Sequence, residues 1–534
     1  MRSIPARHVL LIPLLLPACA PARSPIAVAP TERYDILIAG GTVIDGTGAP
    51  GFRADVAVLD DRIVRVSTEP LSRDHATRVI EATGLVVAPG FIDMHAHLDP
   101  LLRLPGAKSH VTQGVTTALG GPDGGAPWPL APYLDSATVL GLGMNVAFLT
   151  GHNTIRREVM GMADRAPSAA ELQTMQRMVA QAMGEGAWGL STGLKYLPGA
   201  FSDIDEVVAL ARVASDSGGI YTSHLREEGL GLIESVQEAI DIGRRAAITV
   251  VLTHHKAVGQ PMWGSSVRTL AMVDSANALG IDVLMDQYPY TATYTGISVL
   301  IPAWARAGGD SAFFRRLADP ALRDSIVGGI VFNILNDRGG GDLRRVQFAR
   351  VEWMPELEGK TLHDWAVMRG LESTPLVGAE LVIEAEERGG ASAIYHVLDS
   401  TDVERIMRHP RTMIGSDGRL TRPGEGHPHP RWYGTFPRVL GHYVRERGVL
   451  SLEKAVRKMT SLPAATLGME DRGRVATGVF ADIVVFDPAT VDDRATFEDP
   501  HQYSVGIRFV IVNGVPVVDG GRFMDARAGR VLRR

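Results

Sequence analysis

The fold is decided by the stretch from residue 86 to residue 99, which reads VVAPGFIDMHAHLD. A short apolar run that favours a β-strand leads directly into His95 and His97. Because alternate side chains of a strand point to the same face, both imidazoles are expected on one side. Imidazole is a common ligand of zinc and similar divalent ions. Alone, the pair is as compatible with two ordinary histidines as with a metal site, so the rest of the chain decides.

The composition predicts an ordinary globular protein. The chain has 534 residues, enough for a large core and an accessory domain. It is 45% hydrophobic and 21% charged, and its net charge of -6 gives no indication of a nucleic-acid-binding surface. No apolar run approaches the ~20 residues that a membrane-spanning helix needs.

Residues 1–30 are expected to be an export signal followed by a linker. Basic residues, Arg2 and Arg7, precede the apolar run 9–16, and small residues follow up to Cys19. The sequence LPAC that ends at Cys19 resembles a bacterial lipoprotein box, in which the cysteine becomes the lipidated N-terminus. Ordinary signal cleavage is the alternative. Cys19 is the only cysteine, so disulfides and thiolate metal ligands are excluded. We expect a periplasmic protein, either free or anchored to the membrane by a lipid.

Both ends of the chain have the pattern of β-hairpins. Near the start, residues 60–61 (Asp-Asp) form a two-residue turn between apolar runs. Near the end, residues 513–514 (Asn-Gly) do the same. We therefore expect residues 31–88 and 471–534 to form one small β-sandwich domain.

The middle of the chain, residues 89–470, alternates strand-like and helix-like segments, which indicates an α/β fold with a parallel sheet. Helices are expected at 169–184 and 231–245. With the strand after Pro89, the candidates reach the count of a (β/α)8 TIM-like barrel. The others are 115–119, 145–149, 187–191, 219–223, 248–252, 281–285 and 412–415. Residues from about 291 to 384 do not fit one more repeat and are expected to be an insertion between strands 7 and 8, a candidate lid.

Polar side chains that can bind metal stand at the C-terminal ends of these strands, where this fold builds its sites. They are His95, His97, Asp123, Lys195, His224, His254 and Asp417. One of them would mean little, but so many together predict a shared site. His255 neighbours His254 on a strand and should face the opposite way. Residues 226–228 (Arg-Glu-Glu) are expected to orient neighbouring groups or to begin a helix.

The opening PGFID-x-H-x-H, its histidine pair and the late Ser416-Asp417 resemble the amidohydrolase superfamily. More closely, the chain resembles the N-acyl-D-amino-acid deacylases, or D-aminoacylases. The stretches that carry this resemblance are 189–198, 223–228, 253–256, 288–290 and 427–437, the last of which reads HPHPRWYGTFP. The resemblance implies metal-dependent hydrolysis of an N-acyl-D-amino acid to a carboxylate and a free D-amino acid. The partner would be a small N-acyl amino acid or a dipeptide.

The resemblance also implies one or two zinc ions. His224 and His254 would hold the well-occupied site, and His95 and His97 a second, weaker one.

The two ions need a bridge. The best-known members have a bridging cysteine after the second strand, where this chain has Asp123. In other amidohydrolases a lysine after the fourth strand, carboxylated on its amine, bridges two metals, and Lys195 stands there. A site without cysteine needs an oxygen bridge, so we expect Lys195 or Asp123 and favour Lys195.

Asp417 is the predicted catalytic residue and a further metal ligand. It would take a proton from metal-bound water, leaving hydroxide to attack the amide, and return the proton to the leaving amine. Four residues are candidates for the α-carboxylate of the substrate, namely Lys256, Arg431, Tyr196 and Tyr288. Arg431 offers a planar two-pronged donor, Lys256 a point charge and the tyrosines hydroxyl donors.

Three other functions stay open. The chain could be a dipeptidase that releases a C-terminal D-residue, or a cyclic amidase of the hydantoinase or dihydroorotase kind. It could also be a metal-free binding protein that keeps the barrel, although the joint presence of the histidines and Asp417 speaks against this.

Overall fold

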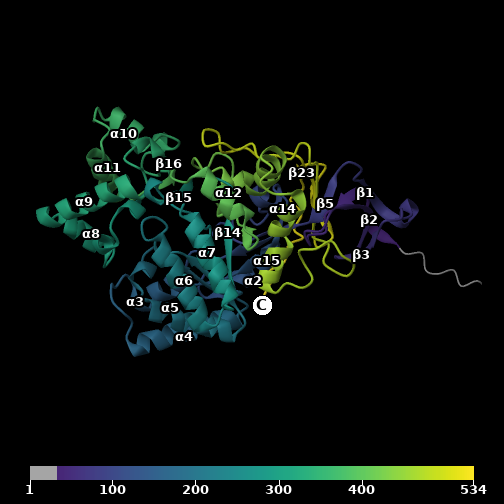
Figure 1. Cartoon of the computed structure of the whole chain (residues 1–534), viewed down its shortest axis with the longest axis horizontal. Helices are drawn as coiled ribbons and strands as arrows, with labels where there is room; N and C mark the ends of the chain where they lie inside the picture. Colours follow the sequence, from purple (N-terminus) through teal and green to yellow (C-terminus); the bar gives the residue numbers. More distant parts are fainter. Residues whose placement is uncertain (1–32) are drawn as a thin grey trace, which may run out of the picture.

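The computed structural model describes residues 33–534. The expected export signal and Cys19 lie outside the described residues. Within them, no helix combines the length and the apolar character needed to pass through a bilayer. Three parts follow one another across the molecule, namely a sheet at one end, a barrel in the middle and a helical insertion at the other end (Figure 1).

The barrel has eight parallel strands, as expected, with β10 continuing the third. They are β6 (Phe91–Asp93), β8 (Val115–Gly120), β9 (Asn145–Phe148) with β10 (Thr150–Gly151), β11 (Gly189–Gly193), β12 (Ile220–His224), β13 (Val250–Leu252), β14 (Val283–Gln287) and β18 (Thr412–Ile414). Between the third and fourth strands, Trp188 N donates to Phe148 O at 2.8 Å. Between the eighth and the first, Asp417 N donates to His95 O at 2.8 Å, and β7 (Ala96–His97) pairs with β19 (Gly418–Arg419). These contacts close the barrel.

Apolar side chains fill the barrel interior, and helices cover its outside. Ile92, Ile220, Leu284 and Met413, each from a different strand, belong to one buried cluster. The predicted helices are α4 (Ala169–Gly184) and α6 (Leu232–Ala246). The others around the barrel are α1 (Lys108–Val111), α2 (Leu130–Leu140), α3 (His152–Met160), α5 (Ile204–Asp216), α7 (Ser266–Ala278), α12 (Ser400–Arg408), α13 (Arg431–Arg438), α14 (Leu452–Met459) and α15 (Ser461–Leu467).

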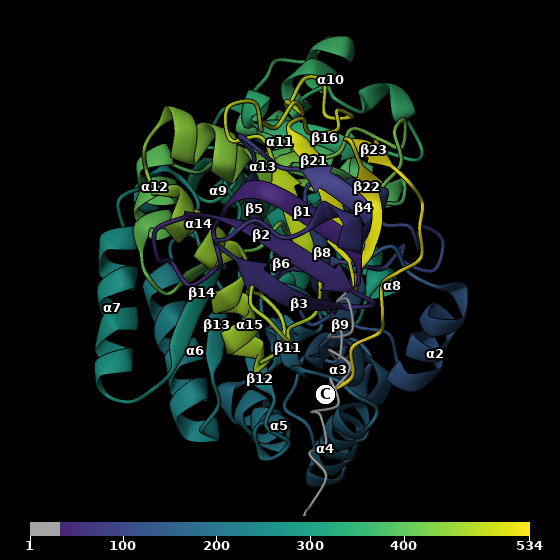
Figure 2. The same cartoon turned by 90° about the vertical axis from the view of Figure 1, so that its right-hand side faces the viewer.

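The two ends of the chain form one sheet (Figure 2). Its strands are β1 (Tyr34–Val43), β2 (Phe52–Leu59), β3 (Arg62–Ser67), β4 (Ala76–Glu81), β5 (Val86–Pro89), β20 (Ile483–Phe486), β21 (Ile507–Val512), β22 (Val515–Asp519) and β23 (Arg522–Phe523). The expected small β domain is therefore present. Its strands form a single hydrogen-bonded sheet, because β5 pairs with β1 on one side and antiparallel with β20 on the other. Buried side chains of both chain ends, including Ile38 and Ile483, share one apolar cluster.

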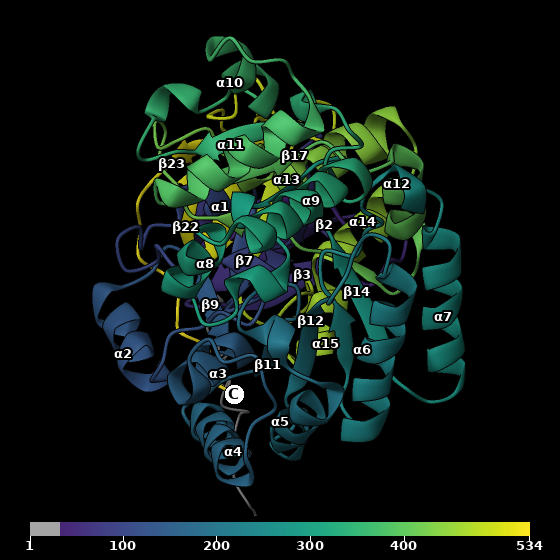
Figure 3. The same ribbon diagram turned by 90° about the vertical axis from the view of Figure 1, so that its left-hand side faces the viewer.

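The insertion between β14 and β18 is a small subdomain with its own core, in which Phe348 and Trp365 are buried. It contains β15 (Thr293–Gly296), α8 (Asp310–Leu317), α9 (Pro320–Asn336), β16 (Val346–Arg350), α10 (Leu362–Met368), α11 (Pro375–Glu387) and β17 (Ser392–Tyr395). It extends beyond the predicted end near residue 384, because β17 is the middle strand between β15 and β16. Its helices lie over one side of the barrel (Figure 3).

Candidate metal centre and active site

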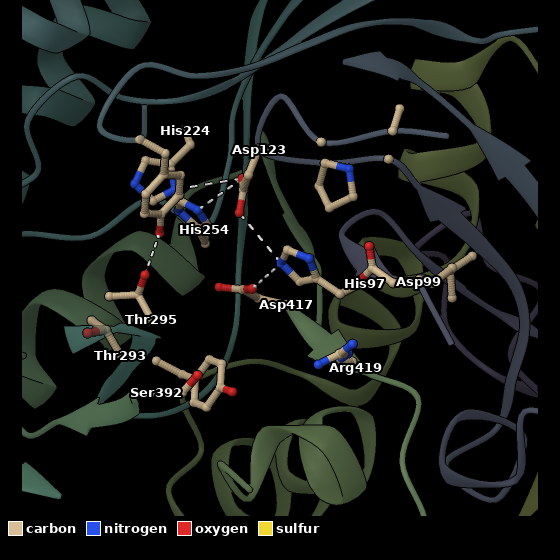
Figure 4. Close-up of a pocket in the computed structure, with 18 of the residues that line it drawn as sticks. His97, Asp99, Asp123, His224, His254, Thr293, Thr295, Ser392, Asp417 and Arg419 are labelled. Carbon is tan, nitrogen blue, oxygen red and sulfur yellow. Dashed lines mark hydrogen bonds and ion pairs between the residues drawn. The ribbon is translucent and has the colours of Figure 1, made fainter. Parts of the chain in front are cut away.

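Two groups of potential metal ligands meet at the C-terminal ends of the barrel strands (Figure 4). The first group is His95, His97, Asp123 and Asp417; the second is Asp123, His224 and His254. Within each group, one ligand atom of every residue lies within 4.8 Å of the others. The sequence predicted this convergence from side chains that are far apart along the chain.

Asp123 belongs to both groups and lies between them. Its Oδ1 is 3.5 Å from His95 Nε2, 3.7 Å from His224 Nδ1 and 3.4 Å from His254 Nε2. Its Oδ2 is 3.5 Å from His97 Nε2. The surrounding imidazoles outweigh the effect of burial and hold the pKa of Asp123 well below its usual range. An ionised carboxylate in this position suits an oxygen bridge between two cations.

The backbone is strained at three of these residues. Asp123, His254 and Asp417 have φ values of 54°, 36° and 47°, in the left-handed region that non-glycine residues seldom adopt. Close contacts surround two of these residues. Asp286 Oδ1 accepts a hydrogen bond from His254 N at 2.7 Å. Gly193 lies so close to Asp123 that a Cβ on it would be 2.2 Å from the Asp123 carbonyl oxygen.

The donor atoms fit zinc. His95 Nε2, His224 Nδ1, His254 Nε2 and Asp123 Oδ1 are buried and have no hydrogen-bond partner within residues 33–534. Buried polar atoms without a partner are costly, which indicates that a ligand satisfies them. Burial lowers the pKa of His224 to about 4, so this imidazole is neutral, the form that binds a metal. At His254, Asp123 and Glu228 outweigh burial and raise the pKa to about 9, so a metal ion would have to displace a proton there. Histidine nitrogens and carboxylate oxygens without thiolate match the ligand sets of catalytic zinc.

Asp417 contacts the first group and Arg431. Its Oδ1 is 3.1 Å from His97 Nε2, 3.7 Å from His95 Nε2 and 2.9 Å from Arg431 Nη2. Arg431 Nε also donates to the Asp417 carbonyl oxygen at 2.8 Å. Burial raises the pKa of Asp417, but Arg431 and the histidines lower it by more, so the net effect is a pKa below the usual range. The carboxylate is therefore ionised and able to accept a proton.

Lys195 is not part of the cluster, and the preference for it as the bridge is corrected. Lys195 Nζ donates to Glu227 Oε2 at 2.7 Å and lies 3.6 Å from Asp337 Oδ2. It lines a second cavity between the barrel and the insertion, and none of the metal ligands lines that cavity. The reason is a turn closed by the hydrogen bond from Tyr196 N to Gly193 O, which redirects the chain after β11.

The four candidates for carboxylate binding line the same cavity as the ligands. This cavity has a volume of about 720 Å³, and Tyr196, Lys256, Tyr288 and Arg431 contribute to its wall. Arg431 Nη1 and Tyr288 Oη are buried and, among the described residues, have no hydrogen-bond partner. The guanidinium lies 4.5 Å from the centre of the Tyr288 ring. These free donors can take a substrate carboxylate.

Two buried charged residues in this cavity, Glu228 and Arg338, were not among the predicted site residues. Glu228 was expected only to orient neighbouring groups or to begin a helix. Arg338 lies in the insertion, whose sequence carries no regular pattern from which its position could be inferred. Other insertion residues, including Thr295 and Ser392, also line the cavity. By contrast, His255 points away as expected, and its Nε2 contacts Thr269 Oγ1 at 2.9 Å.

A closed barrel that gathers histidines and aspartates at the C-terminal ends of its strands defines a metal-dependent hydrolase. Comparison with known proteins identifies the family. A model of the amidohydrolase family matches residues 78–306 and 334–518. The chain belongs to this family, in the group that contains D-aminoacylase and N-acyl-D-glutamate deacylase.

These relatives match over nearly the whole chain. D-aminoacylase of Alcaligenes xylosoxydans xylosoxydans is 38% identical over 94% of this chain and 98% of its own length. A crystal structure of a D-aminoacylase superimposes with a TM-score of 0.79 at 38% identity, covering 94% of this chain and 100% of the other. N-acyl-D-glutamate deacylase of Bordetella bronchiseptica, complexed with zinc and a phosphonate inhibitor, gives 0.79 at 36% identity, with the same coverage.

Proposed function

We propose that this protein hydrolyses the amide bond of N-acyl-D-amino acids and releases a carboxylate and a free D-amino acid. One observation carries the proposal: a cluster fitted for zinc and free donors for a carboxylate lie in one cavity. A substrate with a carboxylate next to its amide nitrogen can contact both at once. The D configuration is supported by the activities for which the relatives are named.

The residues divide the chemistry between them. His95, His97, Asp123, His224 and His254 would hold the zinc, with Asp123 shared by both groups. Zinc supplies a Lewis acid that polarises the amide carbonyl and makes water more acidic. Arg431 and Tyr288 bind the α-carboxylate and thereby orient the amide over the cluster.

Asp417 moves the proton. Its ionised carboxylate accepts a proton from the attacking water, whose oxygen forms a bond to the carbonyl carbon. The C–N bond then breaks, and Asp417 returns the proton to the leaving nitrogen, which becomes the amine of the D-amino acid. Water supplies the oxygen of the new carboxylate, so no other reactant is needed.

The test is a substrate panel on protein whose zinc content has been measured. It contains N-acetyl-D-amino acids, their L-enantiomers, dipeptides with a C-terminal D-residue, and hydantoins. We expect release of free D-amino acids, with the L-enantiomers at least about 100-fold poorer, the size of the penalty for misplaced reacting groups. Equal rates on both enantiomers, or cleavage of hydantoins alone, would contradict the proposal.

We further propose that the protein is exported, on the basis of the sequence of residues 1–30. Fractionation of the native host and mass analysis of the mature N-terminus test this. A lipid on Cys19 that is lost in Cys19→Ser would identify a lipoprotein, and cleavage without lipid would identify a free periplasmic enzyme. An intact Met1 in the mature protein would refute export.

A further inference from the structure

Glu228 is a buried carboxylate that touches both histidines of the second metal group. It follows β12 and is only 2% exposed. Its Oε1 lies 3.2 Å from His254 Nδ1, and its Oε2 lies 3.6 Å from His224 Nε2. These are the ring nitrogens that do not face Asp123.

A histidine that binds a metal through one nitrogen carries its proton on the other, and a carboxylate that accepts this proton fixes the ring. Glu228 is placed to do this for His254, and it lies slightly farther from His224.

The same carboxylate also holds two buried cations. Lys256 Nζ lies 2.5 Å from Glu228 Oε1, and Arg338 Nη2 lies 3.3 Å from Glu228 Oε2. Lys256 Nζ is also 2.6 Å from His254 Nδ1 and 2.7 Å from the His254 carbonyl oxygen. Once His254 Nδ1 carries a proton, Glu228 and the carbonyl remain as acceptors for this ammonium.

The two cations oppose metal binding unless they are neutralised. Lys256 and Arg338 are 6% and 2% exposed, so water screens their charges little. A divalent cation at His224 and His254 would be repelled by both. Glu228 offsets this repulsion with one negative charge, and although burial raises its pKa, Lys256 and the histidines keep it well below the usual range.

Arg338 extends this network to the insertion. It follows α9, and its Nη1 donates to Thr293 Oγ1 on β15 at 3.1 Å. Glu228 therefore contacts groups from the fifth strand, the sixth strand and the insertion.

We propose that Glu228 is a positioning residue for the second metal group: it orients His224 and His254 and offsets part of the positive charge of Lys256 and Arg338, so that a divalent cation can bind. The proposal depends on the zinc site of the proposed function and not on the identity of the substrate.

The test measures zinc affinity by chelator competition, without substrate, on folded protein checked by circular dichroism. Glu228→Gln keeps the size of the side chain and removes its charge, and we expect it to weaken the tighter zinc site by 10- to 100-fold, the usual effect of removing a supporting carboxylate. Glu227→Gln is the matched control. Glu227 is the adjacent residue, its side chain is 43% exposed, and it pairs with Lys195 and not with a metal ligand, so its loss should change zinc affinity by less than about twofold.

Lys256→Met tests the charge argument independently of how Glu228→Gln folds. Removing the ammonium takes away a positive charge near the metal site and leaves the negative charge of Glu228 less compensated. Zinc affinity should therefore rise by about threefold or more. In the double variant, Lys256→Met should restore part of the affinity lost in Glu228→Gln. If both residues had only structural roles, each substitution would weaken zinc binding, and the double variant would show the sum of the two losses. Unchanged zinc affinity in Glu228→Gln, or weaker binding in Lys256→Met, would overturn the proposal.

Discussion

The two metal groups differ more in the exposure of their ligands and in the contacts around them than in the number of ligands. The first has two histidines, its own Asp417 and the shared Asp123, whereas the second has two histidines and Asp123 alone. Ligand number would favour the first group. However, the His97 side chain is 31% exposed, and Asp417 Oδ1 is shared with the Arg431 guanidinium.

The histidines of the second group are buried, and a neighbouring carboxylate contacts them. The His224 and His254 side chains are 4% and 2% exposed, and both face Glu228 with their outer nitrogens. We infer that the second group holds zinc more tightly, and that the exposed first group, with its ionised Asp417, serves the proton transfer. The comparison indicates that the surroundings of the ligands, and not their number, decide which group binds zinc tightly and which group takes part in the reaction.

The largest expected effect is that of Asp417→Asn. An amide cannot accept the proton from water, so turnover should fall by about 10²- to 10⁴-fold, the usual contribution of a general base. Zinc bound by the second group should remain, because Asp417 is not one of its ligands. Turnover and zinc content are measured on the same preparation. Activity within tenfold of the unmodified protein would contradict the assignment.

Two histidine variants compare the groups directly. His224→Ala should remove the tighter zinc, with a loss of affinity of about 100-fold or more, because it removes one of the three ligands of the second group. His97→Ala should remove only the weaker ion and leave the tighter constant nearly unchanged. Zinc titration with a chromophoric chelator measures both constants. The reverse order of losses would invert the comparison.

Arg431→Met tests the carboxylate end of the cavity. We expect kcat/KM for a free-carboxylate substrate to fall by about 10- to 100-fold, the range for a charge-assisted pair of hydrogen bonds. For the matching carboxamide, kcat/KM should fall less. That substrate has no carboxylate to lose, so it is affected only through the contact between Arg431 and Asp417. Equal losses on both substrates would assign Arg431 to positioning Asp417 alone.

The smallest effect is expected for Lys195→Met. Lys195 pairs with Glu227 outside the cluster, so zinc content and turnover should change by less than about twofold. Asp123→Asn is its counterpart and should weaken binding in both groups. A carboxylated lysine in the mass spectrum of the peptide that contains Lys195, together with loss of a zinc ion in Lys195→Met, would return the bridge to Lys195.

The barrel and the convergence of its ligands could be predicted because both follow from periodicity. His224 and His254 come where predicted strands end, and parallel strands bring their ends to one rim. The position of Lys195 could not be predicted in this way. It lies two residues beyond β11, and the turn at Gly193 ends the regular alternation of side chains along the strand, on which the prediction relied.

The contribution of the insertion could not be predicted, because Arg338 reaches the site through a subdomain without a repeating pattern. Glu228 was expected only to orient its neighbours or to begin a helix. Its contacts with two histidines and two cations depend on packing between distant segments, which a local sequence pattern does not encode.

The pairing of β5 with β20 has a consequence for how the protein is made. A ribosome completes the barrel before it adds the last strands of the terminal sheet, so the first strands wait with an unpaired edge while residues 90–482 are synthesised. Closing so long a loop costs little more entropy than closing a shorter one, so the delay is one of time and not of final stability. A chain that ended before residue 483 would leave this edge of β5 unpaired, and an unpaired strand edge is a general risk for aggregation.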